Sequence, residues 1–371
     1  MKVVILVPQF PPKALGGTEI STYSMAKYLA HRGHEVNVIT SLDKGLPQRS
    51  CEFGFYIHRI RLYRIRFVGI ILFWLRILLT IKTINPDIIH VQGITLIGTL
   101  AVITNILFKK PYIVYARGSD IYLPWKYKKI MIKHIFNRAA AIVTLTYDLK
   151  RTVKEMYGKD ALVIPNGVDF DKYINLKDRD LVRSKMGIST ASNVLLFVGT
   201  LKPIKGVRYL IKAMNTVHQS NEDIKLLIVG DGEEKEYLEH LTKKLNLNEV
   251  ISFIGSVPNV KVPDYMYSAD ILVQPSISEG FPVVILEAMA LGLPIITTNV
   301  TGLPEIVGNL RNGLLVEPRD ANDIADKVML MINDNELQKA FSRNNKEDIK
   351  RYGWQEIVKE IELLYSSSLK T

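Results

Sequence analysis

The chain has 371 residues, too many for one compact core, so two folded domains are expected. Its 47% hydrophobic and 23% charged residues are typical of a globular protein. The single cysteine, Cys51, excludes an internal disulfide and fits a reducing compartment. The net charge of +11 favours an anionic partner, which could be a phosphate compound, a nucleotide, a nucleic acid or a membrane surface.

The first half of the chain alternates between strand and helix patterns. The apolar run Lys2–Pro8 is too short for a secretory signal and is expected to form the first strand. A helix is expected at Thr18–His31, with Gly33 as a left-handed residue after its end. Alternating β and α segments predict a mostly parallel sheet covered on both faces, with ligands at the carboxyl ends of its strands. The further expected strands are Glu35–Thr40, Asp87–His90, Tyr112–Ala116, Ala141–Thr144 and Leu162–Ile164.

A glycine pair follows the first expected strand. Gly16 and Gly17 stand just before a helix N-terminus, where a backbone without side chains can approach a phosphate closely. A plain turn is the more common explanation for two glycines in a loop. The pair is therefore a candidate binding element that needs support from elsewhere in the chain.

Polar residues end two later strands of this half. His90 and Gln92 end one of them, where a structural histidine is at least as common as an active-site histidine. Arg117 and Asp120 end the next one. An arginine cannot act as an acid or base near neutral pH, but it can clamp a phosphate or carboxylate with two hydrogen bonds. We therefore predict Arg117 and Asp120 as substrate contacts.

The segment His58–Lys82 combines arginines with an apolar run. The run Val68–Ile81 has 14 residues, short of the ~20 needed to span a bilayer. One interpretation is a strand followed by a buried helix. The other is a helix that exposes Phe73, Trp74 and Leu75 in a membrane interface, with arginines on anionic headgroups. The arginines that precede the run are Arg59, Arg61, Arg64 and Arg66.

The second half of the chain begins after a polar segment, Lys172–Ser192, which is expected to hold the linker. The strand Asn193–Gly199 leads into a loop that contains Thr200, Lys202 and Lys205. Later elements follow the same β–α alternation. Expected strands are Lys225–Gly230, one ending in the loop that holds Gly255, Ser256 and Val257, and Asp270–Gln274; expected helices are Ala321–Ile332 and Gln355–Tyr365.

Two glutamates, Glu279 and Glu287, flank a turn and the start of a helix expected at Val283–Leu291. Pro282 suits the first position of that helix, because the amide it lacks would be unpaired there. Backbone amides around Gly280, Phe281 and Val283 can point at a ligand, and a helix N-terminus favours negative charge. An ionised carboxylate only accepts hydrogen bonds, which suits sugar hydroxyls. The helical rise separates the two carboxylates by roughly 10 Å, the scale of two sugar rings joined by a phosphate linker.

The sequence around Glu279 and Glu287 resembles the E-x7-E signature of family 4 glycosyltransferases. The resemblance is strongest over Asn193–Glu317 and extends to NGVD at 166–169. It implies that Glu287 binds the ribose of a nucleotide, and that Glu279 with the amides after it holds the donor sugar. It also implies that Lys205 binds the diphosphate and that Gly255 and Val257 receive the base. The free amides in question are those of Gly280, Phe281, Val283 and Val284, and Pro282, which has no N–H, is expected beside the same ligand.

This sequence departs from the family pattern at two positions. Thr200 stands where relatives usually have an arginine that grips the diphosphate, and Lys202 could supply the missing charge. Arg117 stands where relatives often have a histidine near the reaction centre. The expected catalytic residues are Lys205, Glu279 and Arg117, and the acceptor chemistry stays open.

The resemblance implies an α/β fold with two Rossmann-like domains facing across a cleft, the GT-B fold. Residues 1–170 would form the acceptor domain and residues 171–350 the nucleotide-sugar domain. The last helix, 351–371, would return to the first domain, with Trp354 as an anchor. The glycine loop at Gly16 and Gly17 would then lie near the donor phosphates and the acceptor.

The expected function is a retaining hexosyltransferase that moves a sugar from a UDP- or GDP-sugar to a hydroxyl of a glycan or lipid-linked acceptor. No His, Cys or Asp cluster has metal-site spacing, so neither a metal nor a further cofactor is expected. No nucleic-acid module is recognisable, so a nucleic-acid partner is not expected. The expected location is the cytoplasm, peripheral to the inner face of the membrane if residues 58–82 touch lipid.

Two other functions remain open. A GT-B nucleotide-sugar epimerase would release a changed sugar without an acceptor, although the glycine loop and the paired glutamates favour a transferase. A non-catalytic nucleotide-sugar or membrane-binding relative would explain the departures at Thr200 and Arg117. An NAD-dependent dehydrogenase is disfavoured, because no G-x-G-x-x-G follows the first strand.

Overall fold

A computed structural model describes residues 1–13, 16–62, 66–94, 96–122, 126–173 and 178–370. The chain divides into two compact units. The first unit comprises Met1–Gly167 together with Trp354–Thr371, and the second comprises Val168–Gly353. Each unit is an α/β domain with its own sheet and its own core.

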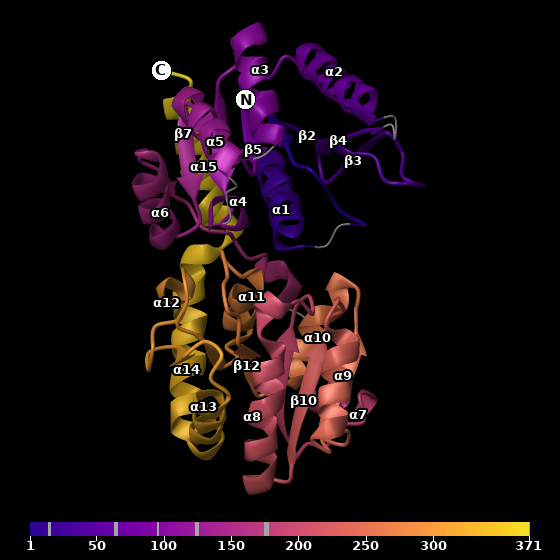
Figure 1. Cartoon of the computed structure of the whole chain (residues 1–371), viewed down its shortest axis with the longest axis vertical. Helices are drawn as coiled ribbons and strands as arrows, with labels where there is room; N and C mark the ends of the chain where they lie inside the picture. The colour runs from indigo at the N-terminus through magenta and orange to yellow at the C-terminus, as the bar shows by residue number, and fades with distance from the viewer. Residues whose placement is uncertain (14–15, 63–65, 95, 123–125, 174–177, 371) are drawn as a thin grey trace. The chain divides into compact units, whose positions relative to one another are not determined.

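The first unit contains an eight-stranded sheet in the order β3-β4-β2-β1-β5-β6-β7-β8 (Figure 1). All neighbouring strands are parallel except β3 and β4, which form an antiparallel hairpin at one edge. The chain order reverses between β1 and β5, which is where open α/β sheets bind ligands. The strands are β1 (Lys2–Leu6), β2 (Glu35–Ser41), β3 (Arg49–Glu52), β4 (Phe55–Ile60), β5 (Ile88–Gln92), β6 (Tyr112–Ala116), β7 (Ala141–Thr144) and β8 (Leu162–Val163).

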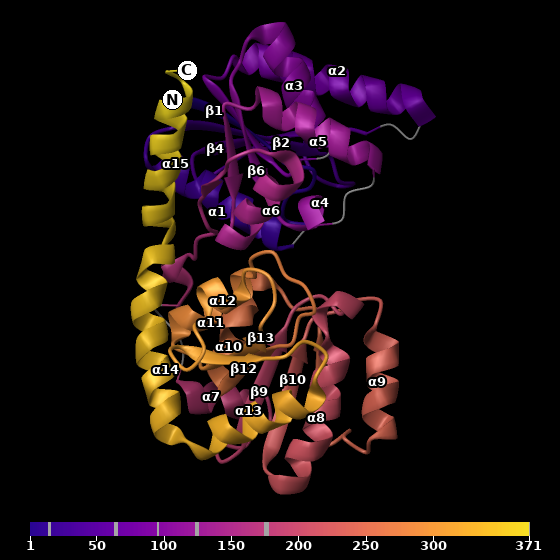
Figure 2. The same cartoon turned by 60° about the vertical axis from the view of Figure 1, so that its left-hand side comes forward.

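Helices cover both faces of this sheet. On one face, α2, α3, α5 and α6 pack on alternate side chains of the central strands to form one apolar core. On the other face lie α1 and the C-terminal helix α15, which contact each other. Figure 2 shows α15 running along the first unit. The helices are α1 (Gly17–His31), α2 (Arg66–Ile84), α3 (Leu96–Phe108), α4 (Ser119–Tyr122), α5 (Lys126–Arg138), α6 (Tyr147–Tyr157) and α15 (Trp354–Ser368).

The second unit contains a six-stranded sheet in the order β11-β10-β9-β12-β13-β14, with all neighbours parallel. Its chain order reverses between β9 and β12. The buried strands are apolar on both faces, as expected for a sheet covered by helices on each side. The strands are β9 (Asn193–Val198), β10 (Ile224–Val229), β11 (Ile251–Gly255), β12 (Ile271–Gln274), β13 (Ile295–Thr298) and β14 (Gly313–Val316).

Helices of the second unit follow its strands in alternation. The chain leaves this unit through α14 and the short helix η4 before α15 begins. The helices are η1 (Phe170–Tyr173), α7 (Arg179–Lys185), η2 (Pro203–Lys205), α8 (Val207–Ser220), α9 (Lys235–Lys244), η3 (Asn259–Lys261), α10 (Val262–Ser268), α11 (Val283–Leu291), α12 (Leu303–Ile306), α13 (Ala321–Asn333), α14 (Asn335–Asp348) and η4 (Ile349–Tyr352).

The expected alternation of strands and helices is confirmed, and so is the return of the last helix to the first unit, where α15 contacts α1. Gly33 has the expected left-handed backbone, with φ +86°. The strands β6 and β7 have the expected bounds. The strand β3 and the helix α14 lie outside the predicted elements, and β4 overlaps the strand of one interpretation of 58–82 only at its end. The β3 sequence, RSCE, has no apolar residue except its cysteine, so no apolar alternation marks it as a strand.

The segment 58–82 forms the end of β4 followed by α2, as the first of the two interpretations has it, and the exposure of Phe73 and Trp74 in the second one does not hold. Phe73 and Trp74 pack against the core of the first unit, while Leu75 is 49% exposed. Arg59 is buried and donates to Ser50 Oγ at 2.8 Å, which removes it from any lipid surface. Arg64 lies outside the described residues. Among the described helices, none combines the length and the apolar character needed to cross a bilayer.

Candidate active site

The loops after β9 and β12 lie at the point where the strand order of the second sheet reverses. The chain leaves β9 through Thr200 and Lys202 and forms the short helix η2 and then α8. It leaves β12 through Ser276 and Glu279 and then forms α11. The amino ends of α8 and α11 therefore stand at the carboxyl edge of two neighbouring strands, the usual position of a ligand in an α/β sheet.

Gly206 allows these two loops to pack against each other. Its backbone is left-handed, with φ +68°, and a Cβ at this position would lie 2.0 Å from the carbonyl oxygen of Pro275. The amide of Ile277 donates to the carbonyl of Ile204 at 2.8 Å and closes the same contact. Any side chain at position 206 would push the loops apart. The residue before Gly206 is Lys205, so this close packing determines where the lysine projects.

Lys205 forms an ion pair with Glu279. The same carboxylate accepts a hydrogen bond from Ser276 Oγ at 3.3 Å. Thr301 holds the backbone of Glu279, because its hydroxyl donates to the Glu279 carbonyl and accepts from the Glu279 amide at 3.4 Å. The side chains of Lys205 and Glu279 are 22% and 16% exposed, so solvent and ligands can still reach them. The structure therefore brings together two of the predicted catalytic residues, with the ammonium in position to pair with an anion.

The turn after Glu279 leads into α11, which begins at Val283 as expected. Pro282 has extended backbone angles and occupies the cap position. It therefore lies one residue before the first helical position, for which its missing amide had suggested it. The side chain of Phe281 is 8% exposed and lies 6.0 Å from the ring of Tyr352, so it serves packing. Amides in the first turn of a helix have no carbonyl partner within that helix. Those of α11, including Val283, follow directly on the Lys205–Glu279 pair.

Glu287 lies in the middle of α11 and meets η1. The hydroxyl of Tyr173 is hydrogen-bonded to the carboxylate, and the positive charge of Lys172 acts on it. Burial raises the pKa of Glu287 above its usual value, while Lys172 and Tyr173 act in the opposite direction. Burial and the negative charge of Glu287 together raise the pKa of Tyr173. Glu287, which was expected to bind the ribose, is half-buried and already has the Tyr173 hydroxyl as a partner.

The other residues expected to contact the donor lie at neighbouring strand ends. Thr200 and Lys202 are exposed after β9. Gly255 ends β11 with a left-handed backbone, and Val257 is half-buried two residues later. All four stand at the carboxyl edge of the same sheet as Lys205, and their contacts with a donor stay predictions.

In the first unit, Arg117 lies at the end of β6 and is held by two amide side chains. Its Nε donates to Gln92 Oε1 at 2.8 Å, and its Nη2 donates to the same oxygen. Its Nη1 donates to Asn166 Oδ1 at 2.7 Å, an oxygen that also accepts from Ser21 Oγ at 2.6 Å. Burial lowers the pKa of Arg117 to about 10, which leaves it charged near neutral pH. Arg117 thus connects three segments of the first unit.

The same network continues to the C-terminal helix through His90. Because Gln92 Oε1 accepts from Arg117, the amide nitrogen of Gln92 faces His90 Nε2 at 3.0 Å and donates to it. His90 Nδ1 therefore carries the proton and donates to the hydroxyl of Tyr365 on α15 at 2.7 Å. Burial and the charge of Arg117 hold the pKa of His90 well below its usual value. His90 is a neutral structural residue within β5.

Asp120 also serves the fold of the first unit. One carboxylate oxygen accepts from the amides of Arg117 and Gly118, each at 3.0 Å. The other oxygen accepts from the amide of Ile94 at 3.1 Å. Burial raises the pKa of Asp120 and these amides lower it. The carboxylate thus joins the loops after β5 and β6, and its predicted substrate contact remains untested.

The glycine pair lies at the start of α1, with Gly16 as the cap and Gly17 as the first helical residue. A Cβ on Gly16 would lie 2.4 Å from a carboxylate oxygen of Glu19. The side chain of Glu19 therefore folds back over the helix N-terminus, where a phosphate was expected. Its negative charge also acts on Arg117.

Two family models match the chain in succession. The model described as Glycosyltransferase Family 4 matches residues 15–172, and the model described as Glycosyl transferases group 1 matches residues 178–348. An uncharacterized glycosyltransferase of Methanocaldococcus jannaschii is 32% identical over 76% of this chain and 78% of its own length. The chain belongs to glycosyltransferase family 4.

Solved structures show the same fold for this glycosyltransferase. Sucrose-phosphate synthase from Thermosynechococcus elongatus matches with a TM-score of 0.88 at 20% identity, over 98% of both chains. The Anabaena protein HepE in complex with UDP-glucose matches with a TM-score of 0.83 at 22% identity, over 99% of this chain and 100% of that one. The predicted GT-B fold is confirmed.

Several residues at these sites were not predicted from the sequence. Tyr173 and Lys172 act on Glu287, and Thr301 and Ser276 hold Glu279. Asn166 belongs to the NGVD motif noted above, but its bond to Arg117 joins residues 49 positions apart. No local pattern signals Tyr173, Lys172, Thr301 or the bond of Asn166, because only the folded chain brings these segments together. Ser276, in contrast, lies three residues before the Glu279 that it contacts.

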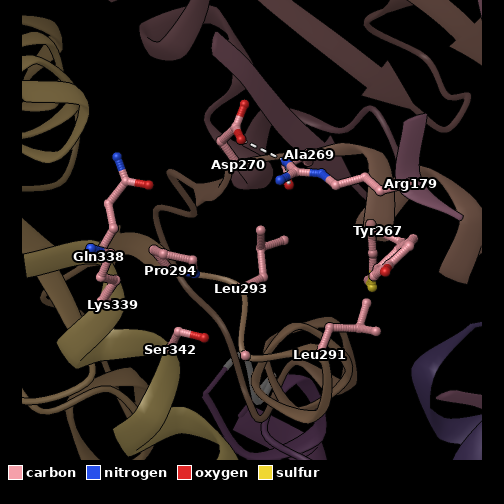
Figure 3. A pocket seen from close by; sticks show the side chains of 12 residues that line it. Arg179, Tyr267, Ala269, Asp270, Leu291, Leu293, Pro294, Gln338, Lys339 and Ser342 are labelled. Atoms are coloured by element: carbon pink, nitrogen blue, oxygen red, sulfur yellow. Dashed lines mark hydrogen bonds and ion pairs between the residues drawn. The ribbon is translucent and has the colours of Figure 1, made fainter. Parts of the chain in front are cut away.

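A further pocket of the glycosyltransferase lies at the opposite edge of the second sheet. Its volume is about 260 Å³, and it is lined by residues such as Arg179, Tyr267 and Leu293. Figure 3 shows Arg179 paired with Asp270, which stands just before β12. This pocket lies at the amino ends of the strands, so it is not the site formed by Lys205 and Glu279. Among the described residues, no three His, Cys, Asp or Glu side chains are grouped as metal ligands.

Proposed function

We propose that this glycosyltransferase binds a nucleotide-sugar in its second unit and transfers the sugar to an acceptor hydroxyl with retention of configuration. The observation that carries the proposal is the Lys205–Glu279 pair beside the amino ends of α8 and α11. A cation beside two helix N-termini is suited to a diphosphate. A carboxylate next to that cation is suited to sugar hydroxyls.

Each part of the donor has a candidate partner. The diphosphate pairs with Lys205 and the first amides of α11, with Lys202 and Thr200 as further contacts. Glu279 and the amides that follow it hold the sugar, and Glu287 accepts from the ribose hydroxyls. Gly255 and Val257 receive the base. A UDP-sugar is the favoured donor, because HepE, which shares the fold, binds UDP-glucose.

The reaction needs a leaving group and a nucleophile on the same face of the sugar. The bond between the anomeric carbon and the diphosphate oxygen breaks, and the acceptor oxygen bonds to that carbon. The acceptor proton passes to the departing diphosphate. Lys205 and the helix amides stabilise the negative charge that develops on the diphosphate, so catalysis depends on positioning and electrostatic stabilisation. This arrangement requires no metal.

The acceptor belongs to the first unit in this proposal. Gly16, Gly17, Arg117 and Asp120 stand at the carboxyl edge of its sheet, and Arg117 supplies a fixed positive charge there. The acceptor is a glycan or a lipid-linked compound. The exposed apolar residues of α2, with Arg61, Arg76 and Lys82 nearby, favour contact with an anionic membrane surface at the cytoplasmic face.

A thermal-shift screen against UDP-glucose, GDP-mannose and ADP-glucose tests the proposal. A ligand that binds only the folded state stabilises it by ~2.7 kcal/mol at one hundred times its dissociation constant. We expect a shift with the UDP-sugar that is lost in Glu287→Ala. The control is Glu239→Ala, which removes an exposed glutamate of the same unit. A shift that persists in Glu287→Ala, or none with any donor, would contradict the proposal.

A further inference from the structure

The first unit contains an apolar cavity of about 390 Å³. It is enclosed by α2, α3 and the carboxyl ends of β1 and β2. This volume falls within the ~300–1,000 Å³ range of small-molecule sites. The side chains that form most of its wall are Leu62, Ile70, Phe73, Trp74, Ile97 and Leu100.

The two hydroxyls on the cavity wall are already paired, and the other polar side chain, Gln9, is exposed. Ser41 Oγ donates to the carbonyl of Pro8 at 2.8 Å, and Thr40 Oγ1 donates to the same carbonyl at 3.3 Å. A glycan or a peptide would bring many hydroxyl or amide groups that need partners, and burying them unpaired is costly. A hydrocarbon chain has no such groups. The chemistry of the wall therefore favours hydrocarbon.

The cavity continues onto an exposed apolar surface. Three large hydrophobic residues of the cavity wall are exposed: Leu62 at 51%, Ile70 at 43% and Leu96 at 60%. Next to them, α2 presents an exposed stripe at helical spacing, which an interfacial helix would lay on lipid. The residues of this α2 stripe are Val68, Ile71, Leu72, Leu75 and Leu79.

Basic residues lie beside this apolar surface and on the next helix along, which suits an anionic lipid. Arg61 is exposed immediately before Leu62. Exposed lysines of α5, Lys128, Lys129 and Lys133, lie on the helix that packs beside α3. Apolar residues with a basic border match a molecule that has a hydrocarbon chain and a phosphate head.

The cavity also lies on the side of the sheet where the acceptor is expected. Pro8 and Gln9, which line it, belong to the segment between β1 and the glycine pair at the start of α1. We propose that this cavity binds the hydrocarbon chain of a lipid-bearing acceptor and leaves its head group at the carboxyl edge of the sheet. The identification of the lipid as an acceptor rests on the proposed glycosyl transfer, whereas chain binding itself can be tested separately.

Calorimetric titration with n-dodecyl phosphate, kept below its micelle concentration, tests the proposal. Each methylene removed from an apolar site weakens binding by ~0.8 kcal/mol, about fourfold. We therefore expect n-octyl phosphate to bind about two orders of magnitude more weakly than n-dodecyl phosphate. Ile97→Trp, which fills the cavity from α3, should weaken dodecyl phosphate binding at least tenfold. Ile106→Trp makes the same change at an exposed position of α3 outside the cavity and should have no effect.

The outcomes test hydrocarbon binding in the cavity separately from binding of the sugar donor. Equal binding of the two chain lengths, or equal binding by Ile97→Trp and the wild type, would overturn the proposal. Loss of binding in Leu79→Asp but not in Ile97→Trp would place the lipid on the α2 stripe and also overturn it. The UDP-glucose thermal shift is measured on the same variants. If dodecyl phosphate binds in the cavity while UDP-glucose does not bind, the proposed function fails but the hydrocarbon-binding cavity is supported.

Discussion

The two units of this glycosyltransferase present polar residues at equivalent sheet edges, but they use them differently. In the second unit, Lys205 and Glu279 pair across two loops and keep part of their surface accessible. In the first unit, Arg117 and Asp120 are held by several hydrogen bonds to other groups of the protein. A salt bridge at a helix N-terminus can open for a diphosphate at little cost, because the lysine exchanges one anion for another. Arg117 would have to give up several hydrogen bonds before it could bind a ligand with the same groups.

This difference separates a binding role from a positioning role. We expect replacement of Arg117 or Asp120 to disturb the geometry that these residues maintain in the first unit. Their replacement should therefore lower stability before it changes donor affinity. Replacement of Lys205 or Glu279 should instead lower donor affinity before it lowers stability.

The largest expected effect is on the rate of sugar transfer in Lys205→Ala. Removal of a group that stabilises charge in the transition state costs ~10²–10³-fold in rate, or ~2.7–4 kcal/mol. The measurement is release of the nucleoside diphosphate at saturating donor. Lys212→Ala removes an exposed lysine of α8 and should keep the wild-type rate. A Lys205→Ala enzyme within threefold of wild type would remove the lysine from the mechanism.

A smaller effect, on stability, is expected for Asp120→Ala. The variant leaves three backbone amides without their charged acceptor, and hydrogen bonds to charged groups contribute ~1.5–3 kcal/mol each. Thermal unfolding should show a lower midpoint for the first unit. Asp160→Ala breaks an exposed ion pair instead, which solvent screens, so its effect on the midpoint should be much smaller. Equal midpoints in the two variants would show that Asp120 does not hold the loops.

Gln92→Ala should destabilise the first unit by ~1–3 kcal/mol, because Arg117 loses an acceptor and His90 loses a donor. Donor affinity should be unchanged, since no donor contact is assigned to Gln92. Chemical denaturation measures the first quantity and a UDP titration the second. The control Gln48→Ala changes an exposed side chain of the same unit. Weakened UDP binding in a stable Gln92→Ala protein would mean that the Arg117 network serves the donor.

The smallest effect concerns the pH dependence of stability in Glu287→Gln. Burial raises the pKa of Glu287 in the folded protein, so the ionised form is disfavoured there. The contribution of this group to stability is present below the pKa of the unfolded chain, ~4.3, and is lost as pH rises through the higher folded pKa. Glu287→Gln should therefore gain thermal stability relative to wild type between acid and neutral pH. A constant difference across that range would show that the shift is absent.

The sequence predicts the local geometry of the second-unit loops better than it predicts the contacts of the polar residues in the first unit. The turn at Gly280, the helix that begins at Val283 and the lysine before Gly206 are local features, and the structure has them at the expected positions. The side-chain partners of Arg117 are Gln92 at the end of β5 and Asn166 in the loop after β8, so no local pattern predicts that these hydrogen bonds are already made. Trp74 is a similar case, because helical spacing alone does not say which apolar stripe of α2 faces the core.

The most direct measurement is a calorimetric titration of UDP into wild type, Glu287→Ala and Gln92→Ala. The second-unit site should lose at least tenfold in affinity when Glu287 is removed, because the ribose hydroxyls lose their charged acceptor. Gln92→Ala should bind UDP as wild type does. Full affinity in Glu287→Ala together with weak binding in Gln92→Ala would contradict the account and assign the donor to the first unit.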